Sequence, residues 1–387
     1  MTTVYHWAFD ELRDSSNGRL DLDRLASTAE GCTYCSGRGA ALEDKMTQAR
    51  GAANSLRRIC CSNVIALGRS SAGLAMARLP RLKVRNETAW YHLYARVAGS
   101  LNLFPLDHPS AHFKLLEIIQ FYTRGYSCEP AAFSIMGNHY HLVLRMEQFR
   151  RLSPDELINR ARYFYPRSQH VLLWRKNEWD RFNKRLFDVS ELMRNIQMAY
   201  AKWHNRKFNR RGGFWEDRFK STLLAHPEAV QECILYVDLN AVRARLVELP
   251  EKWKRSSAYL RYIGKDKWLV PLSELFPATR RTGAFEHYRE MLLFRGTTAS
   301  QSGGGVIATR ALQEEAARGF CRRGVYLNRL RYFTDGVVLG AERQVEEWFT
   351  RLKREGKCLQ RRYPIFHREV EMISLRGQRT LAGHCPG

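Results

Sequence analysis

The short stretch 137–141, Gly-Asn-His-Tyr-His, limits the fold of this chain more than any other feature. Residues 130–136 precede it, and residues 139–146 begin within it. Both segments are apolar and rich in residues that favour β-strands. Gly137 and Asn138 suit a two-residue turn, because glycine accepts positive φ at the first position. The sequence therefore predicts a β-hairpin, with His139 and His141 on one face of its second strand.

The region around the hairpin predicts alternating strands and helices. Residues 88–97 form a strand whose two faces carry Tyr91, Leu93, Ala95 and Val97, and Trp90, His92, Tyr94 and Arg96. Helices are predicted over 108–122, 153–165 and 188–208, and another strand over 214–224. Ser153 and Asp188 are suited to cap the second and third of these helices. This order indicates an α+β fold with an antiparallel sheet.

The charge of the chain favours a polyanionic partner. The 387 residues include 63 Lys and Arg against 39 Asp and Glu, a net charge of +24. An excess of this size is typical of proteins that bind nucleic acid. No apolar run is long enough to predict a membrane span, and the N-terminus lacks a signal pattern. We therefore expect a cytoplasmic protein without a membrane partner.

Two imidazoles on one face of a strand can hold one divalent metal and leave positions open for a substrate. His139 and His141 are the candidates here. A His-x-His pair is short and common, so an ordinary polar face with two solvated histidines is the alternative.

Four blocks follow the His-x-His strand in order: residues 192–205, 213–221, 236–244 and 253–259. Taken together, the five blocks resemble the IS200-like single-tyrosine HUH transposases, in the branch of REP-associated tyrosine transposases. The resemblance covers about residues 78–262. Asn240-Ala241 stands where many relatives have Asn-Pro, which we expect to affect a helix end.

The resemblance implies a fold, an activity and a partner. The fold would be a ferredoxin-like HUH nuclease domain with an antiparallel sheet and helices. The activity would be metal-dependent cleavage and strand transfer of single-stranded or hairpin DNA through a covalent phosphotyrosine, as in transposition and DNA recombination. The metal would be Mg²⁺ or Mn²⁺, and a homodimer would be compatible with this family.

The resemblance also assigns roles to individual residues. His139 and His141 match the metal-binding histidines, and Tyr200 lies where the nucleophile is expected. A polar residue about one helical turn after the tyrosine completes the metal site in relatives. His204 is favoured for this role because position i+4 shares a helix face with the tyrosine, and Asn205 is the alternative.

The choice of nucleophile is open to competing interpretations. Tyr200 is in phase with Ile196 and Trp203, a pattern that by itself indicates a core aromatic residue. Three other tyrosines are rivals for the role: Tyr163, Tyr165 and Tyr236.

Basic residues near the later blocks are candidates for DNA contact. Arg218 and Lys220 alternate on the predicted strand, and Arg243 and Arg245 follow a helix that begins near Pro227. Cations interleaved with aromatic side chains suit single-stranded DNA, whose bases stack and whose backbone is anionic. Ordinary salt bridges are the alternative for each of them.

The composition divides the chain into four parts. Residues 1–75 predict a poorly ordered N-terminal extension and 76–265 the transposase domain. Residues 266–305 predict a linker, and 306–387 a helical C-terminal region that could bind DNA.

Two other functions fit the same residues. A nucleic-acid-binding regulator would keep the fold and the basic surface without cleaving DNA. A metal-dependent hydrolase that uses water would cut DNA but leave no phosphotyrosine. Formation of a covalent adduct distinguishes the transposase chemistry from both.

Overall fold

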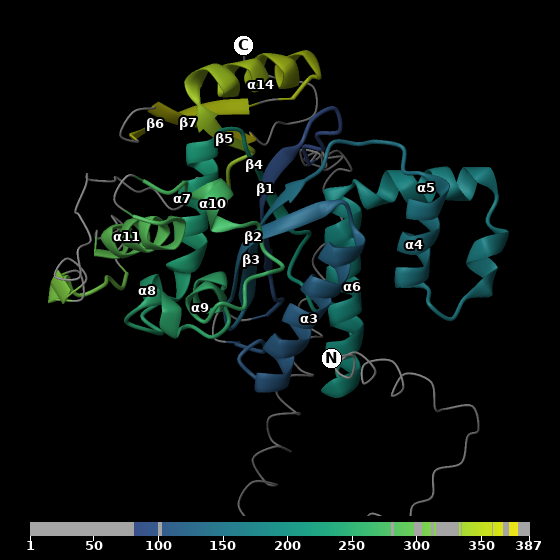
Figure 1. Cartoon of the computed structure of the whole chain (residues 1–387), viewed down its shortest axis with the longest axis horizontal. Coiled ribbons are helices and arrows are strands. Elements are labelled where there is room, and N and C mark those ends of the chain that lie inside the picture. The colour runs from purple at the N-terminus through teal and green to yellow at the C-terminus, as the bar shows by residue number, and fades with distance from the viewer. Residues whose placement is uncertain are drawn as a thin grey trace, which may run out of the picture. The chain divides into compact units, whose positions relative to one another are not determined.

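The predicted hairpin is present and forms one edge of a β-sheet (Figure 1). The computed structural model describes residues 81–377 except for 100–102, 280–281, 298–303, 311–312, 315–332, 334, 358 and 367–370. Strands β2 (Cys128–Ile135) and β3 (His139–Met146) pair antiparallel. A Cβ atom at Gly137 would lie 2.8 Å from side-chain atoms of Asp107 and Phe104, so the turn between the strands favours glycine.

Four strands build the part of the fold that the sequence predicts. β1 (Ala89–Arg96) pairs antiparallel with β3 on one side and with β4 (Lys220–Leu224) on the other. The order is β2-β3-β1-β4. Helix α3 (Pro109–Gly125) connects β1 to β2, and α6 (Val189–Lys207) precedes β4. This is the β-α-β-β-α-β arrangement of ferredoxin-like folds.

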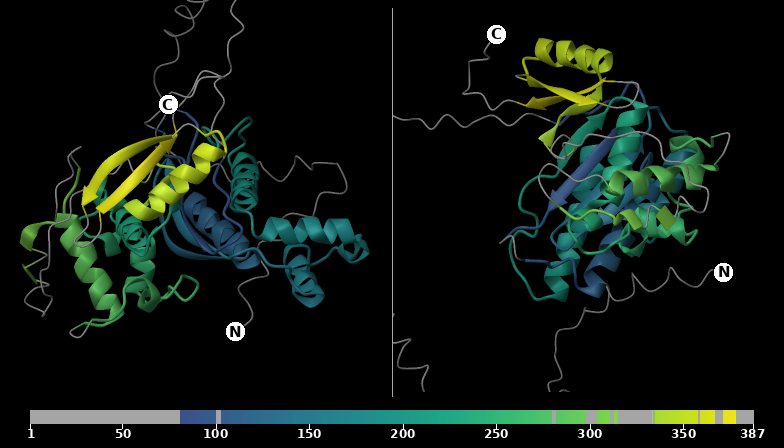
Figure 2. Two further views of the ribbon diagram at one scale, coloured as in Figure 1. Left: turned by 90° about the horizontal axis from the view of Figure 1, so that it is seen from above. Right: turned by 90° about the vertical axis from the view of Figure 1, so that its left-hand side faces the viewer.

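The sheet is larger than a ferredoxin-like sheet, because the C-terminal part of the chain extends it. β5 (Val338–Ala341) pairs parallel with β4, and β7 (Glu371–Gly377) and β6 (Leu359–Phe366) follow by antiparallel pairing. The result is a seven-stranded mixed sheet in an α+β fold. Figure 2 shows α14 (Glu342–Arg354) lying along the strands of this extension. The prediction of a helical C-terminal region over 306–387 is therefore wrong for these three strands, although α14 is a helix.

The helices between β4 and β5 cover the face of the sheet opposite α3 and α6. Their bounds are α7 Pro227–Asp238, α8 Asn240–Arg243, η3 Pro250–Lys252, α9 Ser257–Tyr262, α10 Leu272–Leu275 and α11 Ala284–Thr297. In Figure 1, α3 and α6 lie on one side of the strands and α7, α10 and α11 on the other. Residues 266–305 were predicted to be a linker, yet α10 and α11 fall within them. Leu272, Tyr288 and Leu292 are buried there in the core.

Alternation along β1 and β3 separates two cores. Tyr91 and Leu93 of β1 and Tyr140 of β3 point toward α3 and α6, as predicted. Val143 of β3 belongs instead to the core beneath α7. His92 lies directly opposite Val143 in the register of β1 and β3, so it occupies this second face.

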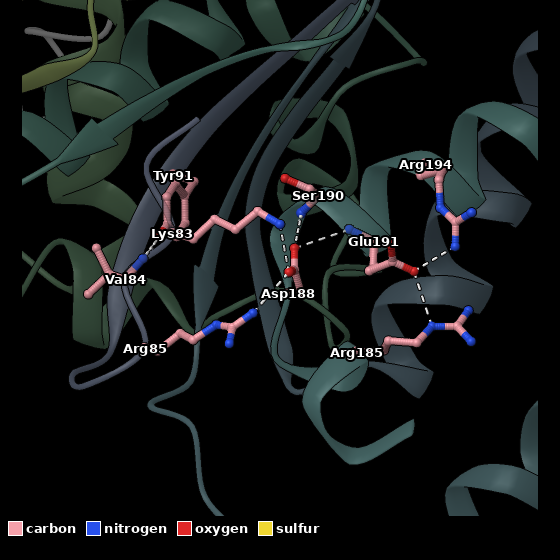
Figure 3. A network of polar contacts seen from close by, with 9 residues as sticks. All are labelled: Lys83, Val84, Arg85, Tyr91, Arg185, Asp188, Ser190, Glu191 and Arg194. Atoms are coloured by element: carbon pink, nitrogen blue, oxygen red, sulfur yellow. Dashed lines mark hydrogen bonds and ion pairs between the residues drawn. The ribbon is translucent and has the colours of Figure 1, made fainter. Parts of the chain in front are cut away.

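Helix α6 begins at the capping residue that the sequence predicts. Asp188 accepts hydrogen bonds from the backbone N–H groups of Ser190 at 2.8 Å and Glu191 at 3.3 Å (Figure 3). Its other carboxylate oxygen receives Lys83 Nζ at 2.7 Å and Arg85 at 3.4 Å. Burial would raise the pKa of Asp188, but Lys83 and the two N–H donors lower it below its ordinary value.

Of the next two helices, the sequence predicts α4 but not α5. α4 (Pro154–Phe164) begins with the predicted capping box of Ser153 and Glu156. Residues 167–187, between the second and third predicted helices, contain a 3₁₀ turn (Gln169–Leu173) and α5 (Lys176–Leu186). On α3, Leu115 is buried and Phe113 is exposed.

Three further predictions concern a membrane span, the N-terminal residues and the division into domains. Among the described residues, no helix is both long and apolar enough to span a membrane. The extension predicted over 1–75 lies outside the described residues, and the division into functional domains stays a prediction.

Candidate active site

His139 and His141 lie on the same face of β3, as the alternation of the strand requires. Their ring centroids are 5.1 Å apart. His141 is fully buried, and His139 is partly exposed at the start of the strand. The Nδ1 atom of His139 contacts Asn138 Oδ1 at 2.7 Å, which leaves its Nε2 as the nitrogen that a ligand could take.

A third histidine joins this pair from the neighbouring strand. His92 of β1 is buried, and its Nε2 lies 2.9 Å from Nδ1 of His141. The two rings are stacked, with centroids 5.1 Å apart and an interplanar angle of 3°. The other nitrogen of His92, Nδ1, donates to the backbone carbonyl of Phe333 at 2.7 Å. The site thus contains a hydrogen-bonded histidine pair that the sequence analysis did not include.

A tyrosine and a lysine complete the polar strip on the sheet. Tyr94 of β1 lies opposite His141 in the register, with 4.9 Å between their ring centroids. On its other side Tyr94 is opposite Lys220 of β4, whose Nζ lies 5.6 Å from the Tyr94 ring centroid. Lys220 is exposed, so a positive charge lies at the edge of this strip.

Helix α7 brings Tyr236 onto the same face. Its ring meets His141 edge-on with centroids 5.6 Å apart, and His92 at 6.0 Å. Phe333 stacks on Tyr236, with ring centroids 4.9 Å apart and an interplanar angle of 18°, and also meets His92 edge-on at 6.4 Å. Tyr236 was one of the rival nucleophiles in the sequence, and the structure brings it next to the histidines.

Asn240 follows Tyr236 by four residues and lies one helical turn further along. Burial raises the pKa of the Tyr236 phenol, while the Asn240 amide acts in the opposite direction. Among the described residues, the buried Asn240 Nδ2 has no hydrogen-bond partner of normal geometry. The N–H₂ group of Asn240 is thus an unpaired donor beside the Tyr236 phenol.

A buried polar network fixes the end of α7 that carries Tyr236. The carboxylate of Asp238 accepts from Ser257 Oγ at 2.5 Å, from Ala258 N at 3.1 Å and from Tyr288 Oη at 2.6 Å. These donors come from α9 and α11, so three helices meet at one carboxylate. The position of Tyr236 over the histidines is therefore set by packing on both sides of α7.

Burial keeps the histidines neutral. It lowers the pKa of His92 to about 4 and, with a contribution from Arg96, the pKa of His139 to about 4. The pKa of His141 is lowered well below its ordinary value by burial and by the two neighbouring histidines. Neutral imidazole is the form that binds metal, so these rings need lose no proton near pH 7.

The predicted nucleophile Tyr200 lies on the opposite face of the sheet. It is fully buried between α6 and the sheet, with Phe214 at 5.1 Å and Trp215 at 5.7 Å between ring centroids. Its hydroxyl has no hydrogen-bond partner among the described residues. The amphipathic phase with Ile196 and Trp203 therefore indicated a core position, which is where Tyr200 lies.

The two predicted third ligands follow Tyr200 to that face. His204 is buried against Phe208 and Phe214, with ring centroids 4.5 and 4.4 Å away. Asn205 donates from Nδ2 to the Gly212 carbonyl at 2.9 Å. Neither residue is brought to His139 and His141, because the sheet separates them.

The four basic residues predicted to contact DNA differ in accessibility. Arg218 and Lys220 are exposed on either side of buried Phe219. Arg245 is exposed with φ of 58°. Arg243 donates to the backbone carbonyls of Arg295 at 2.8 Å and Gly305 at 3.3 Å, so it supports the packing of α11.

The remaining rival tyrosines lie elsewhere. Tyr163 of α4 donates to the Phe121 carbonyl at 3.0 Å and stacks on the Phe121 ring at 4.9 Å. Tyr165 contacts Trp174, with centroids 5.7 Å apart. Both belong to the aromatic packing around α4.

The sequence held a signal that pairs Tyr236 with a polar residue. A polar residue follows Tyr236 at i+4, and the helix predicted from Pro227 would put Tyr236 and Asn240 on one face. His92 was placed on the correct face of its strand, but its register against β3 is set by long-range pairing and could not be read from local pattern.

The donors around the site suit a hard or borderline divalent ion. His139 and His141 would offer imidazole nitrogens and Asn240 an amide oxygen, a mixed set of donors that such an ion accepts. Within the described part of the chain, no group of three or more His, Cys, Asp or Glu side chains is arranged to hold a metal. A site here therefore needs the asparagine or the substrate as an additional ligand.

The chain is similar to a known protein in structure but not in sequence. No protein-family model matches the chain, and no match is found among curated proteins. Among solved structures, the chain is similar to a REP-associated tyrosine transposase bound to a REP hairpin. The identity is 14%, the alignment covers 51% of this chain and 89% of the other, and the TM-score is 0.34.

Proposed function

We propose that this protein cleaves and rejoins single-stranded DNA through a covalent phosphotyrosine, with Tyr236 as the nucleophile. The observation that carries the proposal is the position of Tyr236 over the histidine face of the sheet, 5.6 Å from His141 between ring centroids. The ordered sequence blocks that resemble HUH transposases support the same chemistry. One of those blocks begins at Tyr236.

A divalent ion, Mg²⁺ or Mn²⁺, would be held by His139 and His141, with Asn240 as the third ligand. Such an ion neutralises the charge that develops on the phosphate oxygens. The neutral state of both rings supports their part in this donor set, and Asn240 would contribute its amide oxygen. Asn240 replaces His204 and Asn205 as the polar residue one turn after the tyrosine.

The residues of the chain account for the covalent step. The phenolic oxygen of Tyr236 forms a bond to phosphorus, and the bond from phosphorus to the 3′ oxygen breaks. The phenol loses its proton and the leaving 3′ oxygen gains one, so the products are a 5′-phosphotyrosine and a free 3′-OH. Because the new ester keeps the energy of the old one, a 3′-OH can reverse the step without ATP.

The raised pKa of Tyr236 means that attack by its phenolate needs a cation near the phenol. Burial raises that pKa, so the phenol is protonated at pH 7 when no cation is near. Lys220 lies at the edge of the same strip and could neutralise a DNA phosphate that approaches it. The net charge of +24 favours binding of the polyanion as a whole.

The test is adduct formation with labelled hairpin-bearing single-stranded DNA and Mn²⁺, resolved on a denaturing gel. We expect an adduct with the unchanged protein and with Tyr200→Phe, and none with Tyr236→Phe or His139→Ala. Tyr200→Phe is the matched control, because it removes a phenol from a helix on the opposite face. An adduct that survives Tyr236→Phe and is lost in Tyr200→Phe would overturn the assignment.

The same gel distinguishes the other functions. Cleavage without an adduct would indicate hydrolysis by water. A second candidate is a regulator that binds DNA without cleaving it. One observation favours it: the Phe333 ring stacks on Tyr236 and so covers one side of the proposed nucleophile. Retarded DNA with neither cleavage nor adduct across several hairpins would support it.

A further inference from the structure

We infer that His92, which receives its orientation from the carbonyl of Phe333, is a positioning residue that fixes the ring and tautomer of His141. The inference rests on the proposed function, in which His141 is a metal ligand. It concerns the row of atoms from the Phe333 carbonyl through His92 to His141, joined by contacts of 2.7 and 2.9 Å. This row links the C-terminal part of the chain to the metal-binding strand.

The direction of the hydrogen bonds follows from the groups at the two ends. A backbone carbonyl can only accept, so Nδ1 of His92 carries the proton in the first contact. In neutral His92, Nε2 then has a lone pair and accepts from Nδ1 of His141. His141 consequently keeps its lone pair on Nε2, the nitrogen left for a metal.

The carbonyl at the start of this row is itself fixed. The single Oγ1–H group of Thr222 in β4 lies within donating distance of two carbonyls, that of Gly336 at 2.8 Å and that of Phe333 at 3.0 Å. Thr222 is buried and lies opposite His92 in the register of β1 and β4. The orientation of His92 therefore depends on both a neighbouring strand and the segment that precedes β5.

A purely space-filling role for His92 does not account for these contacts. An apolar residue of similar size would leave a buried carbonyl with one donor fewer and Nδ1 of His141 without a partner. A buried polar atom left unpaired costs about 1–3 kcal/mol. His141 would then also be free to adopt the other tautomer, with the proton on the nitrogen that should bind metal.

The first experiment measures the tautomer directly and needs no metal. In protein labelled with ¹⁵N at histidine, long-range ¹H–¹⁵N correlation spectra report which ring nitrogen carries the proton. We expect His141 and His92 both protonated at Nδ1 at pH 7, with His141 assigned by its loss in His141→Gln. A His141 protonated at Nε2 in the unchanged protein would overturn the inference.

The second experiment measures Mn²⁺ affinity by calorimetry on the full chain. Loss of an outer-shell partner of a metal-binding histidine typically lowers affinity about 10–100-fold. We expect a loss of that size for His92→Leu and recovery to within about 3-fold for His92→Gln, whose amide oxygen can accept from His141. His112→Leu, a buried histidine of α3 on the opposite face, is the control for a general effect on folding.

The outcomes separate this inference from the proposed function. If the unchanged protein binds Mn²⁺ and forms the adduct but His92→Leu binds Mn²⁺ equally well, the inference alone is wrong. If His92→Leu and His112→Leu lose the same affinity, the effect is one of folding and the positioning role is rejected. If the unchanged protein binds Mn²⁺ with the expected tautomers but forms no adduct, the positioning role stands and the cleavage chemistry is rejected.

Discussion

The two faces of the central sheet carry the same kinds of residue in opposite roles. On the face covered by α6, Tyr200 and His204 are enclosed by Phe214 and other aromatic rings. On the face covered by α7, Tyr236 meets histidines that are hydrogen-bonded to one another and to the backbone. A tyrosine close to a histidine therefore does not by itself indicate an active site. Polar partners that orient both rings are needed as well.

The partners explain the difference between the faces. The hydroxyl of Tyr200 and Nδ1 of His204 have no hydrogen-bond partner among the described residues. His92 and His141, by contrast, each use Nδ1 in a short contact. Orphaned polar atoms in an aromatic core indicate packing, whereas a connected row of polar atoms indicates that ring orientation matters.

The largest effect expected from this comparison is on the covalent step. Tyr236→Phe should lower adduct formation at least about 10³-fold, because it removes the proposed nucleophile. Tyr200→Phe should leave the rate within about 2-fold, since its ring keeps the same packing. Equal losses in the two variants, measured as initial rates on the gel, would mean that the two faces are not functionally distinct.

The next largest effect is on metal binding. His141→Ala should weaken Mn²⁺ binding more than about 100-fold, beyond the loss of an outer-shell partner. His204→Ala should bind Mn²⁺ as the unchanged protein does, because the sheet separates it from the site. Calorimetry checks both, and a matching loss in His204→Ala would restore His204 as the third ligand.

A smaller effect is expected on the free energy of unfolding, through the cap of helix α6. Asp188→Ala removes the cap of that helix and the partner of Lys83, and should lower the free energy of unfolding by about 2 kcal/mol. Asp188→Asn should cost less, because asparagine also caps helices. Urea unfolding at pH 7 measures both variants.

The same carboxylate predicts a dependence on pH. Because the folded pKa of Asp188 is depressed, its contribution is fully present above the unfolded value of about 3.9. It is lost as the pH falls through the lower, folded value. The stability difference between the unchanged protein and Asp188→Asn should therefore shrink below about pH 4, and a difference that grows would contradict the ion pair with Lys83.

The smallest effect concerns the Tyr200 hydroxyl. Tyr200→Phe should raise the free energy of unfolding by up to about 1 kcal/mol, since an unpaired buried hydroxyl is removed from an aromatic core. A clear decrease in urea unfolding would show that the hydroxyl has a partner, such as a buried water, and would weaken the contrast between the two faces.

Features encoded by neighbouring residues were predictable from the sequence. The cap at Asp188, the capping box at Ser153 and the two faces of β1 depend on residues within a few positions of each other. The common face of His139 and His141 follows from alternation alone. These predictions are confirmed for that reason.

Features that depend on distant pairing were not predictable. The C-terminal strand β6 was missed because its sequence is rich in arginine and contains Pro364, which usually interrupts strands. Its place at the edge of the sheet tolerates a proline, and the pairing register shifts between Arg362 and Ile365. Likewise, only the pairing of β1 with β3 brings His92 to His141.

The contact of Phe333 with His92 spans 241 residues, and its contact with Thr222 spans 111. A ribosome makes the chain from its N-terminus, so the sheet strands that carry the histidines emerge long before Phe333 does. Contacts of such high sequence separation also form slowly. The contacts from Phe333 through His92 to His141 are thus completed only near the end of synthesis. A chain that stops short of residue 333 would carry the histidines and Tyr236 without this backbone support.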